Sequence, residues 1–403
     1  MAQKGLVNFF ENFLEKKPIF KDKKVLQTNF TPNTIPHRDE QIQQIAQILA
    51  PCLRLEKPSN LFIYGKTGTG KTVSINFVKN QILQVAKEKN VPVKIFYINC
   101  KLKKTADTEY RLISKIIGEF GTEIPPTGLP TDEVYKIFYN LINKEEQLAV
   151  IILDEIDQLV KKTGDEILYN LTRINSDLKN SQISIIGISN DLLFRDSLDP
   201  RVISSLSEEE IMFPPYNALQ IQDILRQRAK KAFNENTIEP GVIEKCAAYA
   251  AREHGDARRA LELLRVSAEL AERQGKTNIS LNHIDEAEDK IDCDRVLDIV
   301  KTHPKQHQAV LFSTITLYNK KDKSIFTGEI YELYKQICNQ TGLRPLTQRR
   351  VSDVIAELDM LGIINATIIS KGRYGRTREI SLAIPSSTEQ KIKEILAEGL
   401  TLS

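Results

Sequence analysis

Apolar residues follow two patterns along the chain, and the pattern changes near residue 215. Before that point, short continuous apolar runs alternate with stretches of helical periodicity, and the runs cover residues 60–64, 93–99, 148–154 and 183–190. Runs of this length between helical stretches are typical of parallel strands that are buried on both faces. The first half of the chain is therefore expected to form a layered α/β domain around a parallel sheet.

Beyond residue 215 the periodicity is helical. Apolar residues recur every three to four positions as far as about Lys290, which predicts a small helical bundle. Further helical segments are followed by an apolar strand, a basic loop and a second strand, and this order predicts a winged helix-turn-helix. We place the three domains at residues 26–214, 215–291 and 292–403.

The N-terminal segment, residues 1–25, is expected to begin with a short amphipathic helix docked on the body. Its apolar residues fall at helical spacing, and they are Leu6, Phe9, Phe10, Phe13 and Leu14. It lacks the continuous apolar core of a signal peptide.

Composition describes an ordinary globular chain, with 41% apolar residues, 27% charged residues and a net charge of +3. No apolar run reaches the roughly 18 to 20 residues of a membrane span, so we expect an intracellular protein without a membrane partner. The five cysteines are scattered, form no C-x-x-C pair and are expected to be reduced and buried. His303 and His307 have i,i+4 spacing, but no further Cys or His cluster joins them, so we expect no metal there.

The strongest motif is "GKTGTGKT", which fits the P-loop pattern G-x-x-x-x-G-K-[ST] and lies between a predicted strand and a predicted helix. Backbone amides of such a loop cradle phosphate oxygens at the helix N-terminus. Lys71 is expected to reach the β and γ phosphates of ATP or ADP, and Thr72 to ligate Mg²⁺. The predicted nucleotide-binding loop comprises Gly65, Lys66, Thr67, Gly68, Thr69, Gly70, Lys71 and Thr72.

Acidic and amide side chains follow two of the predicted strands. Asp154, at the end of a buried strand, is expected to hold Mg²⁺ through water, and Glu155 beside it to polarise an attacking water. Asn190 ends the next apolar strand, where its amide would orient that water or contact the γ-phosphate. The same residue is also placed to cap a following helix, and the two roles do not exclude each other.

Two arginine positions are further candidates. Arg201 follows a proline on an expected exposed turn, where it is either a solvated charge or an arginine finger. Arg258 and Arg259 open a predicted helix, where a cation opposes the helix dipole. That placement favours a purpose such as reaching a nucleotide phosphate.

The winged-helix region carries a local basic charge. Between Arg344 and Arg378, seven Lys or Arg stand against three Asp or Glu, a net +4 that exceeds the formal charge of the whole chain. In the predicted recognition helix, Val351, Ile355, Leu358 and Leu361 are expected to face inward. Thr347 and the candidate base and phosphate contacts Gln348, Arg349 and Arg350 then lie at its N-terminal end. The loop that follows is predicted to enter a DNA groove through Lys371, Gly372, Arg373, Tyr374, Gly375 and Arg376.

These motifs together resemble an ATPase of the AAA+ superfamily, since the P-loop, "DEID", "DPR", "FPPY" and "GDARRAL" occur in the expected order. More narrowly, "IPHRDEQI", "IFYINC", "PPTGLP", "TQRRVSDVIAELDMLGII" and "GRYGRT" resemble the archaeal replication initiators of the origin recognition complex and cell-division-control family. The resemblance covers almost the whole chain. It implies an AAA+ domain, a helical lid and a C-terminal winged helix that binds origin DNA.

The resemblance also implies roles for single residues. Arg258 would be the sensor arginine of the lid, Asn190 the first sensor, and Arg201 the finger offered to a neighbour's nucleotide. Tyr216 and Arg228 would line the nucleotide pocket, with His37 and Arg38 close to the base. Thr127 and Gly128, in "EIPPTGLPTDE", would belong to an initiator-specific insertion that gives duplex DNA a second contact.

The function expected on these grounds is that of an ATP-binding, nucleoid-associated replication initiator that binds duplex origin DNA. Its expected partners are the replicative helicase, which it would help to recruit or load, and other initiator protomers. ATP turnover is expected to be slow and to act as a switch. Two other functions stay open: an AAA+ remodelling ATPase with rapid DNA-stimulated hydrolysis, and a winged-helix transcription regulator whose nucleotide is structural.

Overall fold

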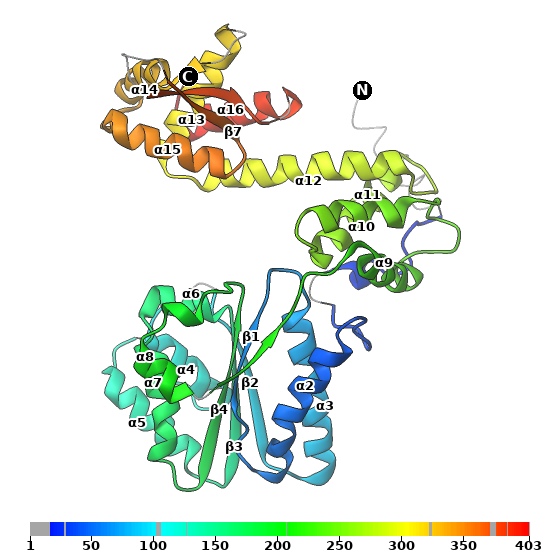
Figure 1. The fold of residues 1–403 in the computed structure, drawn as a ribbon, viewed down its shortest axis with the longest axis vertical. Helices are drawn as coiled ribbons and strands as arrows, with labels where there is room; N and C mark the ends of the chain where they lie inside the picture. The colour runs from blue at the N-terminus through cyan, green and yellow to red at the C-terminus, as the bar shows by residue number, and fades with distance from the viewer. Residues whose placement is uncertain are drawn as a thin grey trace, which may run out of the picture. The chain divides into compact units, whose positions relative to one another are not determined.

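The chain divides into two units between Ile284 and Asp285. The computed structural model describes residues 17–27, 30–101, 106–125, 127–206, 208–321, 325–370, 376–384 and 386–402. Figure 1 shows the elements of both units. The helix expected near the N-terminus falls on residues outside these ranges.

Among the described residues of the first unit, five parallel strands form a sheet in the order β2-β3-β4-β1-β5. They are β1 (Asn60–Tyr64), β2 (Val93–Asn99), β3 (Gln147–Asp154), β4 (Ser181–Ser189) and β5 (Glu208–Met212). Every residue of β3 is buried, which explains the continuous apolar run from Leu148 to Leu153 in its sequence. The four predicted strands are therefore confirmed, and β5 is an addition at the sheet edge.

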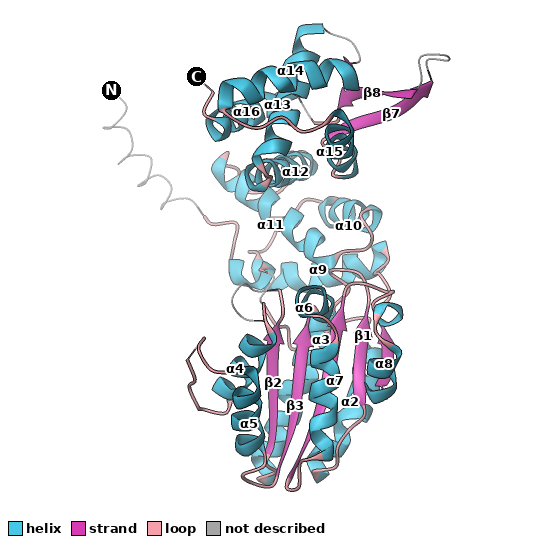
Figure 2. Cartoon of the chain, turned by 90° about the vertical axis from the view of Figure 1, so that its left-hand side faces the viewer, coloured by secondary structure: helices cyan, strands magenta, loops and turns pink. Residues whose placement is uncertain are grey.

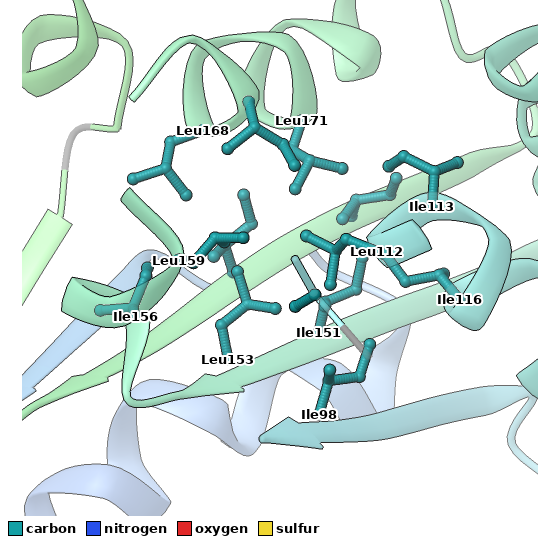
Figure 3. Close-up of a cluster of buried hydrophobic side chains, with 14 of the residues drawn as sticks. Ile98, Leu112, Ile113, Ile116, Ile151, Leu153, Ile156, Leu159, Leu168 and Leu171 are labelled. Atoms are coloured by element: carbon teal, nitrogen blue, oxygen red, sulfur yellow. The ribbon is translucent and has the colours of Figure 1, made fainter. Parts of the chain in front are cut away.

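Helices cover both faces of this sheet (Figures 1 and 2). One face carries α2 (Asp39–Leu49) and α3 (Lys71–Lys89), whose apolar side chains pack with Leu61, Ile63 and Val150. Figure 3 shows the opposite layer, where Leu112, Leu159 and Leu168 pack over Ile151 and Leu153. The helices of that layer are α4 (Glu109–Glu119), α5 (Thr131–Ile142), α6 (Ile156–Thr163), α7 (Glu166–Arg173) and α8 (Pro200–Leu206).

A helical bundle completes the first unit. It contains α9 (Ala218–Ala232), α10 (Val242–Arg252) and α11 (Ala257–Arg273). Residues near the N-terminus pack against it: Ile19 is buried, and its backbone N–H donates to Glu272 Oε1 at 2.9 Å. Short 3₁₀ helices lie at η1 (Lys23–Leu26), η2 (Ala50–Arg54), η3 (Ile174–Ser176) and η4 (Arg195–Ser197).

The second unit takes most of the long helix α12 (Leu281–Thr302) and continues with helices and a small antiparallel sheet. In its described ranges that sheet has the order β6-β8-β7. Figure 2 shows β7 and β8 as a two-stranded ribbon beside α15. The remaining elements are α13 (Lys305–Lys321), β6 (Ile325–Phe326), α14 (Thr327–Thr341), α15 (Gln348–Met360), β7 (Ile364–Ser370), β8 (Arg376–Leu382) and α16 (Ser386–Leu400).

One predicted core position is wrong. Val351, Ile355 and Leu358 are buried as expected, but Leu361 is 40% exposed and Val354 takes its place in the core. The helix ends at Met360, so Leu361 no longer follows the helical spacing, whereas Val354 lies three residues after Val351 on the same face. The cysteines are free of disulfides, and all but Cys293 are buried. No helix in the described ranges is both long enough and apolar enough to cross a lipid bilayer.

Candidate functional site

The P-loop joins β1 to α3, as its sequence predicts. Gly68 and Gly70 have φ angles of +70° and +93°, a region that L-residues with side chains rarely adopt. The Lys71 ammonium folds back under the loop and donates to the carbonyl oxygens of Gly65 (2.6 Å) and Lys66 (2.7 Å). It also donates to Asn190 Oδ1 at 2.9 Å, which joins the loop to the end of β4.

Burial disfavours the charged form of the Lys71 ammonium. Lys71 is 5% exposed, and desolvation lowers its pKa to about 8, although the Asp154 carboxylate raises it. The Arg258 guanidinium of the lid lowers it further. A buried cation facing a second cation is a setting that favours binding of an anion.

Asp154 is the best-connected carboxylate of the site. Its Oδ2 accepts from the Thr72 hydroxyl at 2.8 Å and from the Tyr97 hydroxyl at 2.5 Å, and its Oδ1 accepts from the backbone N–H of Glu155 at 2.9 Å. Burial and the neighbouring Asp154 raise the pKa of Tyr97, so its phenol stays a donor. The oxygens of Thr72 and Asp154 are hard ligands of the kind that Mg²⁺ takes, directly or through water. The two predicted metal residues thus lie together, and their neighbour Tyr97 lies in the "IFYINC" stretch, for which the sequence predicted no role in the site.

Glu155 and Asn190, the residues expected to act on water, lie at the same carboxyl edge of the sheet. Glu155 precedes α6 with a φ of +56°, and its carboxylate lies 3.5 Å from Lys101 Nζ. Asn190 directly follows β4, and its side-chain oxygen accepts the hydrogen bond from Lys71. In this structure both side chains therefore have protein partners.

A pocket of about 860 Å³ opens between the P-loop and the lid. Apolar side chains, including Phe30, form one part of its wall, while Tyr216, Arg228 and Arg258 form another. The Arg228 guanidinium lies 4.6 Å from the centre of the Phe30 ring, and its Nη1 donates to the carbonyl of Val25. The described residues that line the pocket are Gln27, Phe30, Pro32, Thr34, Ile35, Pro36, Gly68, Gly70, Thr72, Val73, Tyr216, Ile224, Gln227, Arg228, Lys231, Ala257, Arg258 and Leu261.

The lid touches the P-loop directly. Asp256 caps α11 by accepting from the backbone N–H groups of Arg258 (2.7 Å) and Arg259 (3.3 Å). A Cβ at Gly68 would overlap the Asp256 carboxylate, and the Ala257 N–H donates to the Gly68 carbonyl at 3.3 Å. The cap holds the first turn of α11, with Arg258 on it, at the loop. Arg259 instead pairs with Glu253 at 3.2 Å.

Arg38 lies beneath the loop. It is 2% exposed, its Nε donates to the Thr69 carbonyl at 2.9 Å, and its guanidinium lies 3.9 Å from the centre of the Tyr216 ring. His37 Nε2 lies 3.2 Å from Asp223 Oδ2 on α9. Neither is among the described residues that line the pocket, so their contact with a base stays a prediction. In this structure Arg38 instead links the P-loop, through Thr69, to the ring of Tyr216.

Arg201 and the Thr127 region lie on exposed surfaces. The Arg201 side chain is 83% exposed, and its Nε and Nη2 each lie 3.1 Å from a different oxygen of Asp199. Gly128 has a φ of +115°, and a Cβ there would meet open space. Thr127 is exposed beside it. Both surfaces are therefore accessible in the first unit.

The second unit presents the N-terminal end of α15. Thr347 caps this helix by accepting from the Arg350 N–H, and Gln348 and Arg349 line a groove of about 1160 Å³. From β8, Arg378 reaches the same groove and donates to the Ser352 carbonyl, tying the strand to the helix. Arg350 stands apart from the groove, 3.7 Å from Asp353. Lys371, Gly372, Arg373, Tyr374 and Gly375 fall outside the described residues, and Arg376 is described only as the first residue of β8.

Three family models match the chain, one for each predicted domain. An AAA domain model matches residues 54–194, a Cdc6 AAA+ ATPase-type lid domain model matches 222–289, and a CDC6 C-terminal winged helix domain model matches 298–391. The predicted fold class, an AAA+ domain with a helical lid and a winged helix, is confirmed.

Relatives that match almost the whole chain point to the same family as these domain models. The chain is 52% identical over 399 residues to an ORC1-type DNA replication protein of Thermococcus onnurineus, covering 98% of this chain and 95% of the relative. It is 51% identical over 397 residues to a protein of the same name from Pyrococcus abyssi, covering 98% and 93%. Among solved structures, the Aeropyrum pernix ORC1 protein in complex with DNA superposes with a TM-score of 0.83 at 43% identity, covering 95% of this chain and 98% of that one.

Proposed function

Because the chain belongs to the family of ORC1-type DNA replication proteins, we propose that it is an ATP-binding replication initiator that recognises duplex origin DNA. The observation that carries the proposal is the pairing of a nucleotide-type pocket in one unit with a basic winged helix in the other. The similar Aeropyrum pernix ORC1 protein was solved with DNA, and this supports the same ligand class for the chain.

The nucleotide is proposed to bind in the pocket between the P-loop and the lid. Lys71 and the loop amides would hold its phosphates, Arg258 would approach them from α11, and the apolar wall around Phe30 would take the base. Thr72 and Asp154 would hold Mg²⁺. When bound, that ion neutralises charge on the β and γ phosphates.

Hydrolysis is proposed to be slow and to serve as a switch. Glu155 would polarise the attacking water, and Asn190 would sense the γ-phosphate. In the described structure Glu155 lies beside Lys101, and Asn190 accepts from Lys71. Both contacts would be exchanged as the nucleotide binds, before these side chains act on water.

DNA is proposed to bind the second unit through α15 and the wing. Gln348 and Arg349 share a groove, so base edges and phosphates would be read there, with Arg350 reaching the backbone beside it. Residues Lys371 to Arg376 would extend this contact as the wing. Thr127 and Gly128 on the first unit would give the duplex a second contact.

Recruitment of the replicative helicase and assembly with other initiator protomers complete the proposal, together with nucleoid association in the cell. The exposed Arg201 supports a role between protomers, because a finger must reach another molecule's nucleotide.

Genome-wide occupancy of the chain in cells is the experiment that tests the proposal. We expect binding concentrated at replication origins, and occupancy spread over promoters would favour the transcription regulator instead. Steady-state ATP hydrolysis with and without origin DNA separates the remodelling ATPase, which would turn over rapidly on DNA. In the same assay Glu155→Gln should bind ATP but not hydrolyse it.

A further inference from the structure

Tyr97 contacts the candidate metal site although no motif of the sequence gives it a role there. In the sheet, Asn99 of β2 pairs with Asp154 of β3. Tyr97 precedes Asn99 by two residues and so points to the same face. From this position the Tyr97 hydroxyl donates to Asp154 Oδ2 at 2.5 Å.

The Asp154 carboxylate is thereby held from separate elements. Tyr97 and Thr72 donate to Oδ2 from β2 and α3, and the Glu155 N–H donates to Oδ1 from the next peptide. Hydrogen bonds to a carboxylate are short and strong, and together they fix the plane in which its free lone pairs lie. Thr72 is itself expected to face the metal, so Tyr97 is the side-chain donor from outside the P-loop that keeps this orientation.

We propose that Tyr97 is a positioning residue for Mg²⁺: it orients the Asp154 carboxylate so that Mg²⁺-bound ATP is preferred over free ATP. This inference rests on the proposed nucleotide site. Partners of metal-binding carboxylates tune metal affinity without touching the ion, and their loss typically costs about 10- to 100-fold. The effect should therefore fall on Mg²⁺ and not on the phosphate contacts of Lys71.

A purely structural tyrosine is the alternative. The Tyr97 ring packs against the core layer of α3, and Lys79 Nζ lies 5.7 Å from its centre. Tyr97→Phe keeps this ring packing and removes only the hydroxyl, so it separates the two roles. Tyr139→Phe is the matched control, because the Tyr139 hydroxyl donates at the same distance of 2.5 Å to the carbonyl of Asp177, away from the nucleotide pocket.

The experiment titrates a fluorescent ATP analogue against the full-length wild type and both variants, first in EDTA and then at increasing Mg²⁺. For Tyr97→Phe we expect unchanged affinity in EDTA and a half-saturating Mg²⁺ concentration raised about tenfold. The control should match the wild type in both conditions. In an Asp154→Asn background, Tyr97→Phe should add no further loss, since the two residues act through one contact.

Two results would overturn the inference alone: an unchanged half-saturating Mg²⁺ concentration in Tyr97→Phe, or an equal loss of affinity in EDTA, which marks a structural role. Failure of the wild type to bind ATP in any condition would overturn the proposed function, and the inference with it.

Discussion

The Lys71 ammonium donates a 2.9 Å hydrogen bond to Asn190 Oδ1, so the P-loop lysine is joined to the amide that follows β4. The same ammonium holds the carbonyls of Gly65 and Lys66. A γ-phosphate arriving at this point would replace neutral acceptors with an anion, which a buried cation prefers. Nucleotide binding would then release Asn190, and this would couple occupancy of the loop to the end of β4.

Lys71→Ala should weaken ATP binding about 30- to 150-fold, because charge-assisted hydrogen bonds of this kind contribute about 2 to 3 kcal/mol. Fluorescence titration with labelled ATP measures the loss. Lys66→Ala is the matched control: its side chain is exposed, while its backbone amide stays in the loop. The control should bind within about twofold of the wild type. Equal losses in the two variants would contradict the role given to Lys71.

Arg201→Ala should lower ATP hydrolysis about tenfold or more in assemblies and leave a monomer unaffected, since a finger acts on another molecule's γ-phosphate. Its pairing with Asp199 is solvent-exposed and therefore readily exchanged. Specific activity measured across protein concentration, alongside sedimentation, tests this. Arg195→Ala, another exposed arginine, paired with Glu210 at 3.0 Å, is the control. Impairment at every concentration would point to a local structural role for Arg201.

Arg373→Ala, in the predicted wing, should weaken DNA binding and reduce the slope of log affinity against log salt by about one. This is the signature of a single lost phosphate or minor-groove contact. The measurement titrates an origin-derived duplex and a scrambled duplex at several salt concentrations. An unchanged slope would assign the basic loop to another partner, such as an acidic protein surface.

Changes at Gln348 or Arg349 should act on sequence preference instead. Both side chains line the groove at the start of α15, where a base-edge contact is worth about 1 to 3 kcal/mol of discrimination. Alanine at either position should therefore narrow the affinity difference between origin and scrambled duplexes. A loss equal on both duplexes would show that the residue contacts only the backbone.

The second unit should lose stability as pH falls from about 7 to 5, in part through His303. Burial lowers the pKa of His303, the neighbouring His307 lowers it further, and Glu357 opposes the shift. The unfolded chain then binds the proton more readily, so this stability is present above the unfolded pKa and is lost as pH falls through it. Thermal unfolding of the full chain at pH 7.5 and 5.5 measures the change.

His303→Gln should flatten this pH dependence, because the group that takes up the proton on unfolding is removed. The His303 ring stacks on His307 with centres 5.4 Å apart, and its Nε2 is buried without a hydrogen-bond partner in the described structure. A variant as pH-sensitive as the wild type would place the titrating group elsewhere.

Much of the fold could be predicted because burial on both faces leaves a direct mark in the sequence. β3 is apolar from Leu148 to Leu153, and Asp154 at its end and Asn190 directly after the neighbouring β4 lie where they were expected. β5 was missed because it begins with three glutamates, which an edge strand tolerates. The two-residue β6 was missed because it is too short to show a period.

The residues of the candidate site also differ in how far the sequence could identify them. The P-loop has a fixed local spacing, so its residues could be named in advance. Tyr97 acts through a contact between segments far apart in the chain, and in sequence it looks like a core aromatic. Arg38 was expected near the base from the resemblance, but no local spacing marks its contact with the Thr69 carbonyl. Leu361 was misplaced because helical spacing was extended one residue beyond the end of α15.

The strand order has a consequence for synthesis of the protein. β1, which leads into the P-loop, is made first, but its neighbours in the sheet are β4 and β5. At ribosomal rates the strand waits on the order of ten seconds for the chain to reach Ser181. During that time an apolar strand and its loop have no sheet to join. The nucleotide site of this chain can therefore form only after β4 has been made, late in the synthesis of the first unit.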